Sequence, residues 1–300
     1  MPEKNSIYLL PIGGLGNRMR AVDSAKALAA ESSKNLVVLW KSNFELNCRY
    51  DELFEPSKSF RVEEIAESDD YYPRAVRRLK RARWNPFVPT SHIIKEFDFA
   101  LGDEEISKLY NPKKLSQQTN PETLQEGLYK RFNQEMKPQI TAAGTSVYMT
   151  SCFRVAPSPA GYPDFTPTPE LMGKINAFTS DFKNTIGIHI RRTDHGPATR
   201  HSGTELFKQK ISQLLQANPE QNFLVCTDSQ ETEQELAAEF GDKILIYPKA
   251  YVGRDTKQGI QEALIEMWCL SRTQKIMGSF SSTFSEVAAS IGHIPLEIVK

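Results

Sequence analysis

The second half of the chain alternates short apolar runs with stretches in which apolar residues recur every three or four positions. The apolar runs have the length of buried strands and lie at 185–191, 222–227, 243–248, 275–279 and 294–299. The stretches with helical spacing lie at 204–217, 230–240, 260–272 and 282–292. Strands that alternate with amphipathic helices form a parallel sheet covered by helices. We therefore predict a doubly wound, Rossmann-like domain in this half.

The first half begins with the same alternation and then loses it. A strand, a helix and a second strand are predicted at 7–12, 20–32 and 35–40, with a glycine turn after the first strand. Residues 41–145 are polar and rich in charge. Further strands are indicated only at 92–99 and at 146–153. The whole chain is therefore predicted to have an α/β fold.

A proline-rich stretch separates the two halves. Residues 156–169 contain five prolines, which favours an extended linker or a surface loop. We place the boundary there, with one domain at 1–165 and another at 166–300. The expected architecture is two Rossmann-like domains that face each other across a cleft.

The composition is that of an ordinary globular protein. Of the 300 residues, 39% are hydrophobic and 25% are charged, so the chain can form a sizeable hydrophobic core. The 37 basic side chains balance the 37 acidic ones, which argues against a general binder of nucleic acid or of anionic membranes. The apolar run near the N-terminus is too short for a membrane span or a signal peptide. We expect a cytoplasmic protein and make no prediction of its oligomeric state.

The cysteines and histidines do not indicate a metal. The four cysteines form no CxxC pair and no disulfide framework, so buried free thiols are expected. His189, His195 and His201 lack the spacing of a zinc site. His189 is predicted to be either a nucleotide contact or a core histidine.

A run at 74–84 holds six basic residues. It fits a helix with Val76 and Leu79 inward and its charges in water. It also fits a patch that meets an anionic acceptor or surface, and the sequence does not decide between the two.

The strand predicted at 185–191 ends in a group of polar and charged side chains, namely His189, Arg191, Arg192 and Asp194. Side chains of a strand alternate between its faces, so His189 and Arg191 point one way and Arg192 the other. The carboxyl end of a parallel strand meets the ligand crevice. We predict that Arg191 binds phosphate there and that Arg192 forms a structural ion pair.

Two other turns follow strands of the second half. The turn at 278–285 is rich in hydroxyls, and Thr283 and Glu286 fit a capping box at the start of a helix. A helix N-terminus binds anions through its backbone N–H groups, to which serine hydroxyls add donors. Asp228 follows the strand at 222–227 and is predicted on the same side as Arg191, where it also fits a helix N-cap.

The glycine turn of the first half fails the dinucleotide fingerprint. Met19 stands where a third glycine belongs, and no acidic residue follows the second strand. NAD and FAD are therefore disfavoured. What remains is a turn that lets the backbone approach a ligand, with Asn17 and Arg18 displayed beside it.

Together these motifs resemble those of the α1,6/α1,2/protein O-fucosyltransferase superfamily. The matching elements are HIRRTD at 189–194, TDS at 227–229, SFSSTFS at 279–285 and GGLGN at 13–17. Residues 41–170 carry no resemblance of this kind. The resemblance implies a GT-B fold, a GDP-fucose donor, no cofactor, and inverting transfer without a metal to an oligosaccharide acceptor. It also implies that 166–300 binds the donor and 1–165 the acceptor.

The resemblance also assigns roles to single residues. Arg191 holds the β-phosphate, His189 borders the nucleotide, and Glu266 reads guanine. The remaining donor contacts implied are Gly14, Gly16, Asn17, Asp228, Ser281, Ser282, Thr283 and Phe284. An inverting enzyme also needs a base, for which Asp194 is the candidate we name, with Asp23 and His195 as the others.

Three alternatives stay open at this point. The donor could be another nucleotide sugar such as GDP-mannose, the chain could be a dinucleotide-binding oxidoreductase, or it could bind a sugar nucleotide without turnover.

Overall fold

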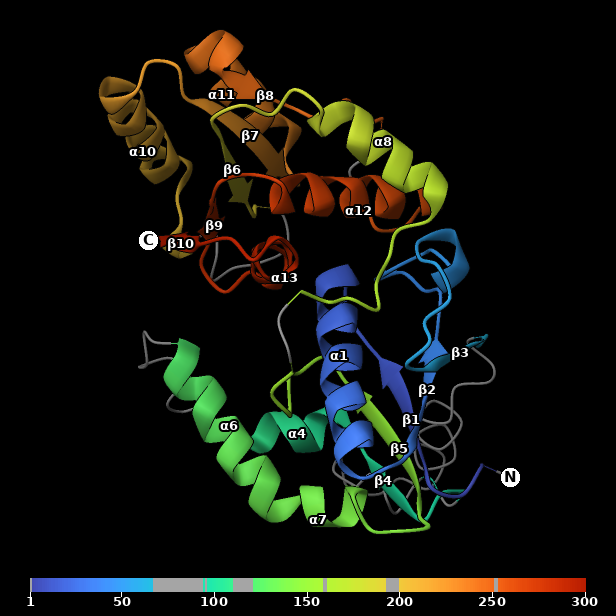
Figure 1. The fold of residues 1–300 in the computed structure, drawn as a ribbon. Helices are drawn as coiled ribbons and strands as arrows, with labels where there is room; N and C mark the ends of the chain where they lie inside the picture. Colours follow the sequence, from blue (N-terminus) through green and yellow to red (C-terminus); the bar gives the residue numbers. More distant parts are fainter. Residues whose placement is uncertain are drawn as a thin grey trace, which may run out of the picture. The chain divides into compact units, whose positions relative to one another are not determined.

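The computed structural model describes residues 2–66, 94, 96–109, 121–158, 161–192, 200–250 and 253–300. They form two compact units, each built on a five-stranded parallel sheet (Figure 1). The first unit contains residues 1–51 and 56–159, and the second contains 52–55 and 160–300. Two helix-covered parallel sheets confirm the predicted α/β fold class. The basic run at 74–84, Asp194 and His195 lie outside the described residues.

The sheet of the second unit has the strand order β10-β9-β6-β7-β8, and every adjacent pair is parallel. Its strands are β6 (Thr185–Ile190), β7 (Asn222–Thr227), β8 (Ile244–Leu245), β9 (Ile276–Ser279) and β10 (Leu296–Val299). Its helices are α8 (Pro169–Thr179), α10 (Thr204–Ala217), α11 (Gln230–Phe240), α12 (Lys257–Ser271) and α13 (Thr283–Gly292). A short 3₁₀ turn, η3 (Gly241–Lys243), leads into β8.

Helices cover both faces of this sheet. Ile186, Ile188 and Ile190 of β6 pack in one apolar cluster with side chains of α10 and α11. On the other face, Gly187 lies so close to α12 that an added Cβ would come within 2.8 Å of the Leu270 side chain. Alternate residues of one strand therefore meet different helices, as in a doubly wound sheet.

The sheet of the first unit has the order β3-β2-β1-β5-β4. Its strands are β1 (Ser6–Pro11), β2 (Asn35–Trp40), β3 (Arg61–Glu64), β4 (Phe99–Leu101) and β5 (Ser146–Ser151). Its helices are α1 (Leu15–Glu31), α4 (Asp103–Leu109), α6 (Pro121–Glu135) and α7 (Lys137–Ile140), with a 3₁₀ turn η1 at Tyr50–Glu52. The sequence did not predict β3, η1, α4, α6 or α7, and the strand predicted at 92–99 overlaps β4 only at Phe99.

Helix α1 begins earlier than predicted. Gly13 has a φ of +81°, which glycine adopts without strain, and Gly14 is the N-cap, so the helix starts at Leu15 and not near residue 20. Gly16 and Asn17 consequently belong to its first turn.

A short segment from the first half of the sequence belongs to the second unit. The ring of Phe54 packs against Phe165 and Trp268, with centroids 5.1 Å and 6.1 Å away. The backbone N–H of Glu55 donates to the carbonyl of Thr166 at 2.8 Å. Nothing in the hydrophobic pattern indicates this exchange, because it depends on contacts between residues more than 100 positions apart.

Candidate functional site

The candidate site lies where β6 and β9 end. In the order β10-β9-β6-β7-β8, the chain leaves β6 toward β7 on one side and returns to β9 on the other. Ligands of open α/β sheets bind beyond the carboxyl ends of the strands at such a reversal of strand order. The side chains just after β6, β7 and β9 are therefore the first to consider.

A network of polar contacts joins these three strand ends. The backbone N–H of Arg191 donates to Oγ of Ser279 at 3.0 Å. The next N–H, of Arg192, donates to Oδ1 of Asp228 at 2.7 Å, while Oδ2 lies 3.3 Å from Nε of Arg191. The side chains of Arg191 and Asp228 are 17% and 16% exposed, so their attraction is only partly screened by water. Asp228 thus fixes both the backbone and the guanidinium at the end of β6.

Arg192 points away from this network. Its Nη2 donates to the carbonyl of Ser202, and the Ser202 hydroxyl accepts the N–H of Phe280 at 2.8 Å. Burial lowers the pKa of Arg192, while Asp228 and Glu235 oppose that shift. The side chain thus makes a structural contact, but this partner is a backbone carbonyl and not the acidic group of the predicted ion pair.

His189 is buried, with 5% of its surface exposed. Its ring stacks on Phe284 with centroids 4.7 Å apart, and Nδ1 lies 3.3 Å from Oγ of Ser282. Burial, and then the positive charge of Arg191, lower its pKa to about 3, so the imidazole is neutral at pH 7. Of the two roles that the sequence left open, burial favours the core histidine.

The hydroxyl-rich turn after β9 leads into α13, but the predicted capping box is wrong by one residue. The N-cap is Ser282, not Thr283, and its hydroxyl contacts His189 in place of a backbone N–H. Thr283 and Phe284 form the half-buried first turn of the helix. The first N–H groups of a helix have no intrahelical partner and favour anions.

Two unusual backbone positions shape this turn. Ser281 is exposed and has a φ of +58°, a conformation that few residues other than glycine adopt. At Gly278, an added Cβ would lie 2.7 Å from Oγ and 2.9 Å from Cβ of Ser285. Only glycine therefore lets the first turn of α13 approach β9 so closely.

Glu266, the residue expected to read guanine, pairs with a lysine. Its Oε1 lies 2.6 Å from Nζ of Lys249, which also contacts Glu233. Burial raises the pKa of Glu266 to about 7, and Lys249 opposes that shift. Its carboxylate is thus already engaged within the second unit. No local pattern points to Lys249 or Glu233, since one lies in a loop and the other on α11.

The glycine turn of the first unit is tied to its surroundings by side chains. The N–H of Gly13 donates to Oε2 of Glu45 at 3.1 Å, and Oδ1 of Asn17 accepts from Arg20 at 3.2 Å. Arg20 also donates to the carbonyl of Cys152 at 2.8 Å, just after β5. Gly14, Gly16 and Asn17 therefore lie at the carboxyl edge of the first sheet.

Arg18 is not displayed beside the turn, as the sequence suggested, but is 0% exposed. Its guanidinium donates to the carbonyls of Gly13 and Lys41 at 2.9 Å and 2.6 Å and lies over the ring of Trp40. Burial lowers its pKa to about 10. The residue holds the turn against the end of β2.

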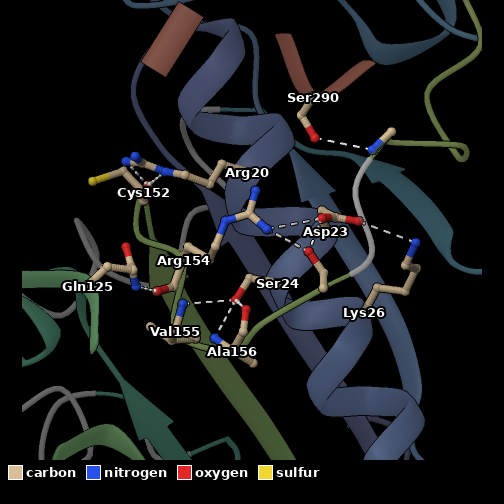
Figure 2. A network of polar contacts seen from close by, with 12 residues as sticks. Arg20, Asp23, Ser24, Lys26, Gln125, Cys152, Arg154, Val155, Ala156 and Ser290 are labelled. Atoms are coloured by element: carbon tan, nitrogen blue, oxygen red, sulfur yellow. Dashed lines mark hydrogen bonds and ion pairs between the residues drawn. The ribbon is translucent and has the colours of Figure 1, made fainter. Parts of the chain in front are cut away.

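Asp23, one of the candidate bases, has a side chain that is 1% exposed. Figure 2 shows its carboxylate between Lys26 and Arg154, at 3.3 Å and 3.6 Å, and Ser158 donates to it as well. A carboxylate held by two cations in the interior is a structural group, so this environment does not favour Asp23 as a base.

In the part of the chain that the structure describes, no group of histidine, cysteine or acidic side chains could hold a metal ion. Among the same residues, no helix is long and apolar enough to cross a membrane.

Comparison with solved structures identifies the fold. NodZ alpha-1,6-fucosyltransferase co-crystallised with GDP matches over 96% of this chain and 92% of its own, with a TM-score of 0.58 and 16% identity. The same enzyme soaked with GDP-fucose matches with a TM-score of 0.57 and 16% identity over 97% and 93% of the two chains. A mutant of Arabidopsis thaliana FUT1 in complex with GDP matches over 99% of this chain and 70% of its own, with a TM-score of 0.54 and 16% identity.

No protein-family profile and no curated protein matches the sequence. At 16% identity, the likeness to the solved structures shows a common fold. The chain has the fold of these fucosyltransferases, which confirms the predicted GT-B class and agrees with the superfamily that its motifs resemble.

Proposed function

We propose that this protein is a glycosyltransferase that moves fucose from GDP-fucose to an oligosaccharide acceptor. The observation that carries the proposal is the guanidinium of Arg191, held by Asp228 where β6, β7 and β9 end. The fold supports it as well, because two of the similar structures contain GDP and one was soaked with GDP-fucose.

The proposed donor site lies in the second unit. Breaking the bond between the sugar and the β-phosphate develops negative charge on the phosphate. A fixed guanidinium and the first turn of α13 are preorganised donors for that charge, with the hydroxyls of Ser282 and Thr283 nearby. These groups can stabilise the leaving GDP without a metal ion, so we propose a metal-independent reaction.

Inversion at the sugar carbon requires a base that takes the proton from the acceptor hydroxyl. Asp194 lies two residues after Arg192 in the sequence and remains our candidate. The ion-paired environment of Asp23 makes that residue the weaker choice.

We further propose that residues 166–300 bind the donor and residues 1–165 the acceptor. The four cysteines are free thiols, as in proteins of a reducing compartment, which supports the cytoplasm as the proposed location.

Calorimetry with GDP, UDP and NAD tests the donor class. We expect GDP to bind at least about tenfold more tightly than the other two, and equal binding of all three contradicts the proposal. Mass spectrometry of reactions with GDP-fucose and GDP-mannose then identifies the sugar.

Arg191→Ala tests the mechanism. We expect kcat to fall by about 10²–10³-fold while the far-UV circular dichroism spectrum is unchanged. Retained wild-type turnover in Arg191→Ala, or complete loss of wild-type turnover in EDTA, contradicts the proposed mechanism.

A further inference from the structure

Phe44 is the single large hydrophobic side chain that stands exposed among the described residues, with 84% of its surface in contact with solvent. It lies in the first unit, three residues after the buried Lys41 that follows β2. An isolated exposed apolar residue needs no explanation by itself. What distinguishes Phe44 is the rigid turn that carries it.

Reciprocal backbone bonds close this turn. The N–H of Asn43 donates to the carbonyl of Leu46 at 3.0 Å, and the N–H of Leu46 donates back to the carbonyl of Asn43 at 3.0 Å. Oδ1 of Asn43 accepts the N–H of Glu45 at 3.0 Å and that of Leu46 at 3.1 Å. The backbone on both sides of Phe44 is thus fixed.

The turn is anchored to the interior by the buried Arg18. Its Nη2 donates to Oδ1 of Asn43 at 2.9 Å, and its other nitrogens donate to Gly13 and Lys41. Glu45 ties the turn a second time, because its carboxylate accepts the N–H of Gly13. Burying a charged guanidinium costs free energy, because the charge loses its hydration. Here the buried guanidinium of Arg18 fixes the turn whose tip carries the exposed ring of Phe44.

We propose that Phe44 is a stacking platform for a pyranose ring of the acceptor oligosaccharide. The face of an aromatic ring is electron-rich, while one face of a pyranose carries weakly positive C–H groups and little polar surface. A ring on a fixed turn loses little conformational entropy on binding. The next residue, Glu45, is half-buried, and its carboxylate accepts hydrogen bonds, as it does from Gly13, so it is an acceptor of the kind that sugar hydroxyls bind.

This inference rests on the proposed transferase function, because it assigns the ring to the acceptor of that reaction. Its test is the binding of three neutral probes, cellotetraose, chitotetraose and maltotetraose, measured by saturation-transfer NMR and titration. We expect the wild-type protein to bind at least one of them. Phe44→Ala should weaken that binding by about tenfold, and Phe44→Trp should retain it.

Lys58→Ala, a substitution of an exposed residue of the same unit, is the control and should bind the probes as the wild type does. Phe44→Ala should leave the unfolding temperature and GDP binding unchanged, since the ring is exposed. The inference is overturned if no probe binds the wild type, or if Phe44→Ala binds the probe equally well. It is also overturned if the ring proves to mediate self-association, seen as a dimer that Phe44→Ala abolishes.

The two proposals fail in different ways. Loss of GDP selectivity in the wild type contradicts the proposed transferase, whatever the probes do. Normal GDP binding together with unchanged probe binding in Phe44→Ala contradicts the platform alone.

Discussion

Oδ2 of Asp228 lies 3.3 Å from Nε of Arg191, at the point where β7 and β6 end side by side. The other carboxylate oxygen accepts the N–H of Arg192 at 2.7 Å. This ion pair through Nε restricts the orientation of the guanidinium. We therefore propose that Asp228 positions Arg191, in addition to the direct donor contact that the motif resemblance implies.

Asp228→Asn keeps the shape of the side chain and removes its charge. We expect kcat to fall by about tenfold, because a neutral amide orients Arg191 less firmly, with a smaller change in the KM for GDP-fucose. In an Arg191→Ala background the same substitution should have no further effect on kcat. Additive losses in the double variant would show that Asp228 acts independently of Arg191.

His189 predicts how stability depends on pH. Its pKa is about 3 in the folded protein, below the ordinary value of 6.5, so the unfolded chain binds a proton that the folded protein rejects. The contribution of His189 is present above pH 6.5 and is lost as the pH falls toward 3. Between pH 7 and pH 5 the loss amounts to about 2 kcal/mol of unfolding free energy.

Urea unfolding at pH 7 and pH 5 measures this loss. His189→Gln should lack it, so the difference in unfolding free energy between the two pH values becomes smaller than in the wild type. His201→Gln, which changes an exposed histidine, should behave like the wild type. Equal pH dependence in His189→Gln and the wild type would mean that His189 titrates normally.

Lys249 neutralises buried carboxylates of Glu233 and Glu266. Lys249→Met leaves them without their cation, so we expect a loss of about 3 kcal/mol of unfolding free energy at pH 8. The pKa of Glu266 is already raised from 4.5 to about 7, so the folded state binds a proton that the unfolded state releases. The contribution of Glu266 to the free energy of unfolding therefore rises as the pH falls from about 7 toward 4.5. The loss of unfolding free energy in Lys249→Met should accordingly become smaller toward pH 5.

Thermal and urea unfolding of Lys249→Met across pH 5–8 check this prediction. Adding Glu266→Gln to the variant should recover part of the loss at pH 8, because it removes one uncompensated charge. A deficit that does not vary with pH would indicate lost packing of the lysine stem in place of charge.

Gly278→Ala tests the close approach of α13 to β9. The new Cβ would meet Ser285 at less than 3 Å, so we expect a cost of about 2 kcal/mol and a parallel loss of GDP affinity. Gly173→Ala in α8 is the matched control, because an added Cβ meets nothing within 4 Å there. Adding Ser285→Gly to Gly278→Ala should restore GDP binding more than it restores stability, since glycine inside a helix costs about 1 kcal/mol.

Most of the regular elements of the second unit follow from the hydrophobic pattern, but α8 was not predicted. The bounds predicted for α10, α11 and β7 are those of the structure. β8 is shorter than predicted, because the apolar run at 243–248 pairs with β7 only at Ile244–Leu245. In the first unit, polar residues mask the periodicity of apolar positions from which strands and helices are predicted. The sequence therefore missed β3, α4, α6 and α7.

The sequence predicted that the candidate site lies at the ends of the strands. It did not predict which side chains of the site contact one another. Strand alternation separated Arg191 from Arg192 correctly, since it depends only on backbone geometry. The sequence could not predict that Glu266 pairs with Lys249 or that Asp23 pairs with Arg154. These partners are distant in sequence, and which of several cations a carboxylate meets depends on packing.

The sequence by itself determined the fold class, the strand ends that carry charge and the turn that opens α13, because these depend on the local period of apolar residues and on glycine and serine chemistry. Only the tertiary structure decided which side chains are buried. It enclosed the charged side chain of Arg18 and left the apolar ring of Phe44 in solvent. The burial of a side chain depends on all the residues that pack around it, many of them distant in sequence. A local sequence pattern therefore does not determine it.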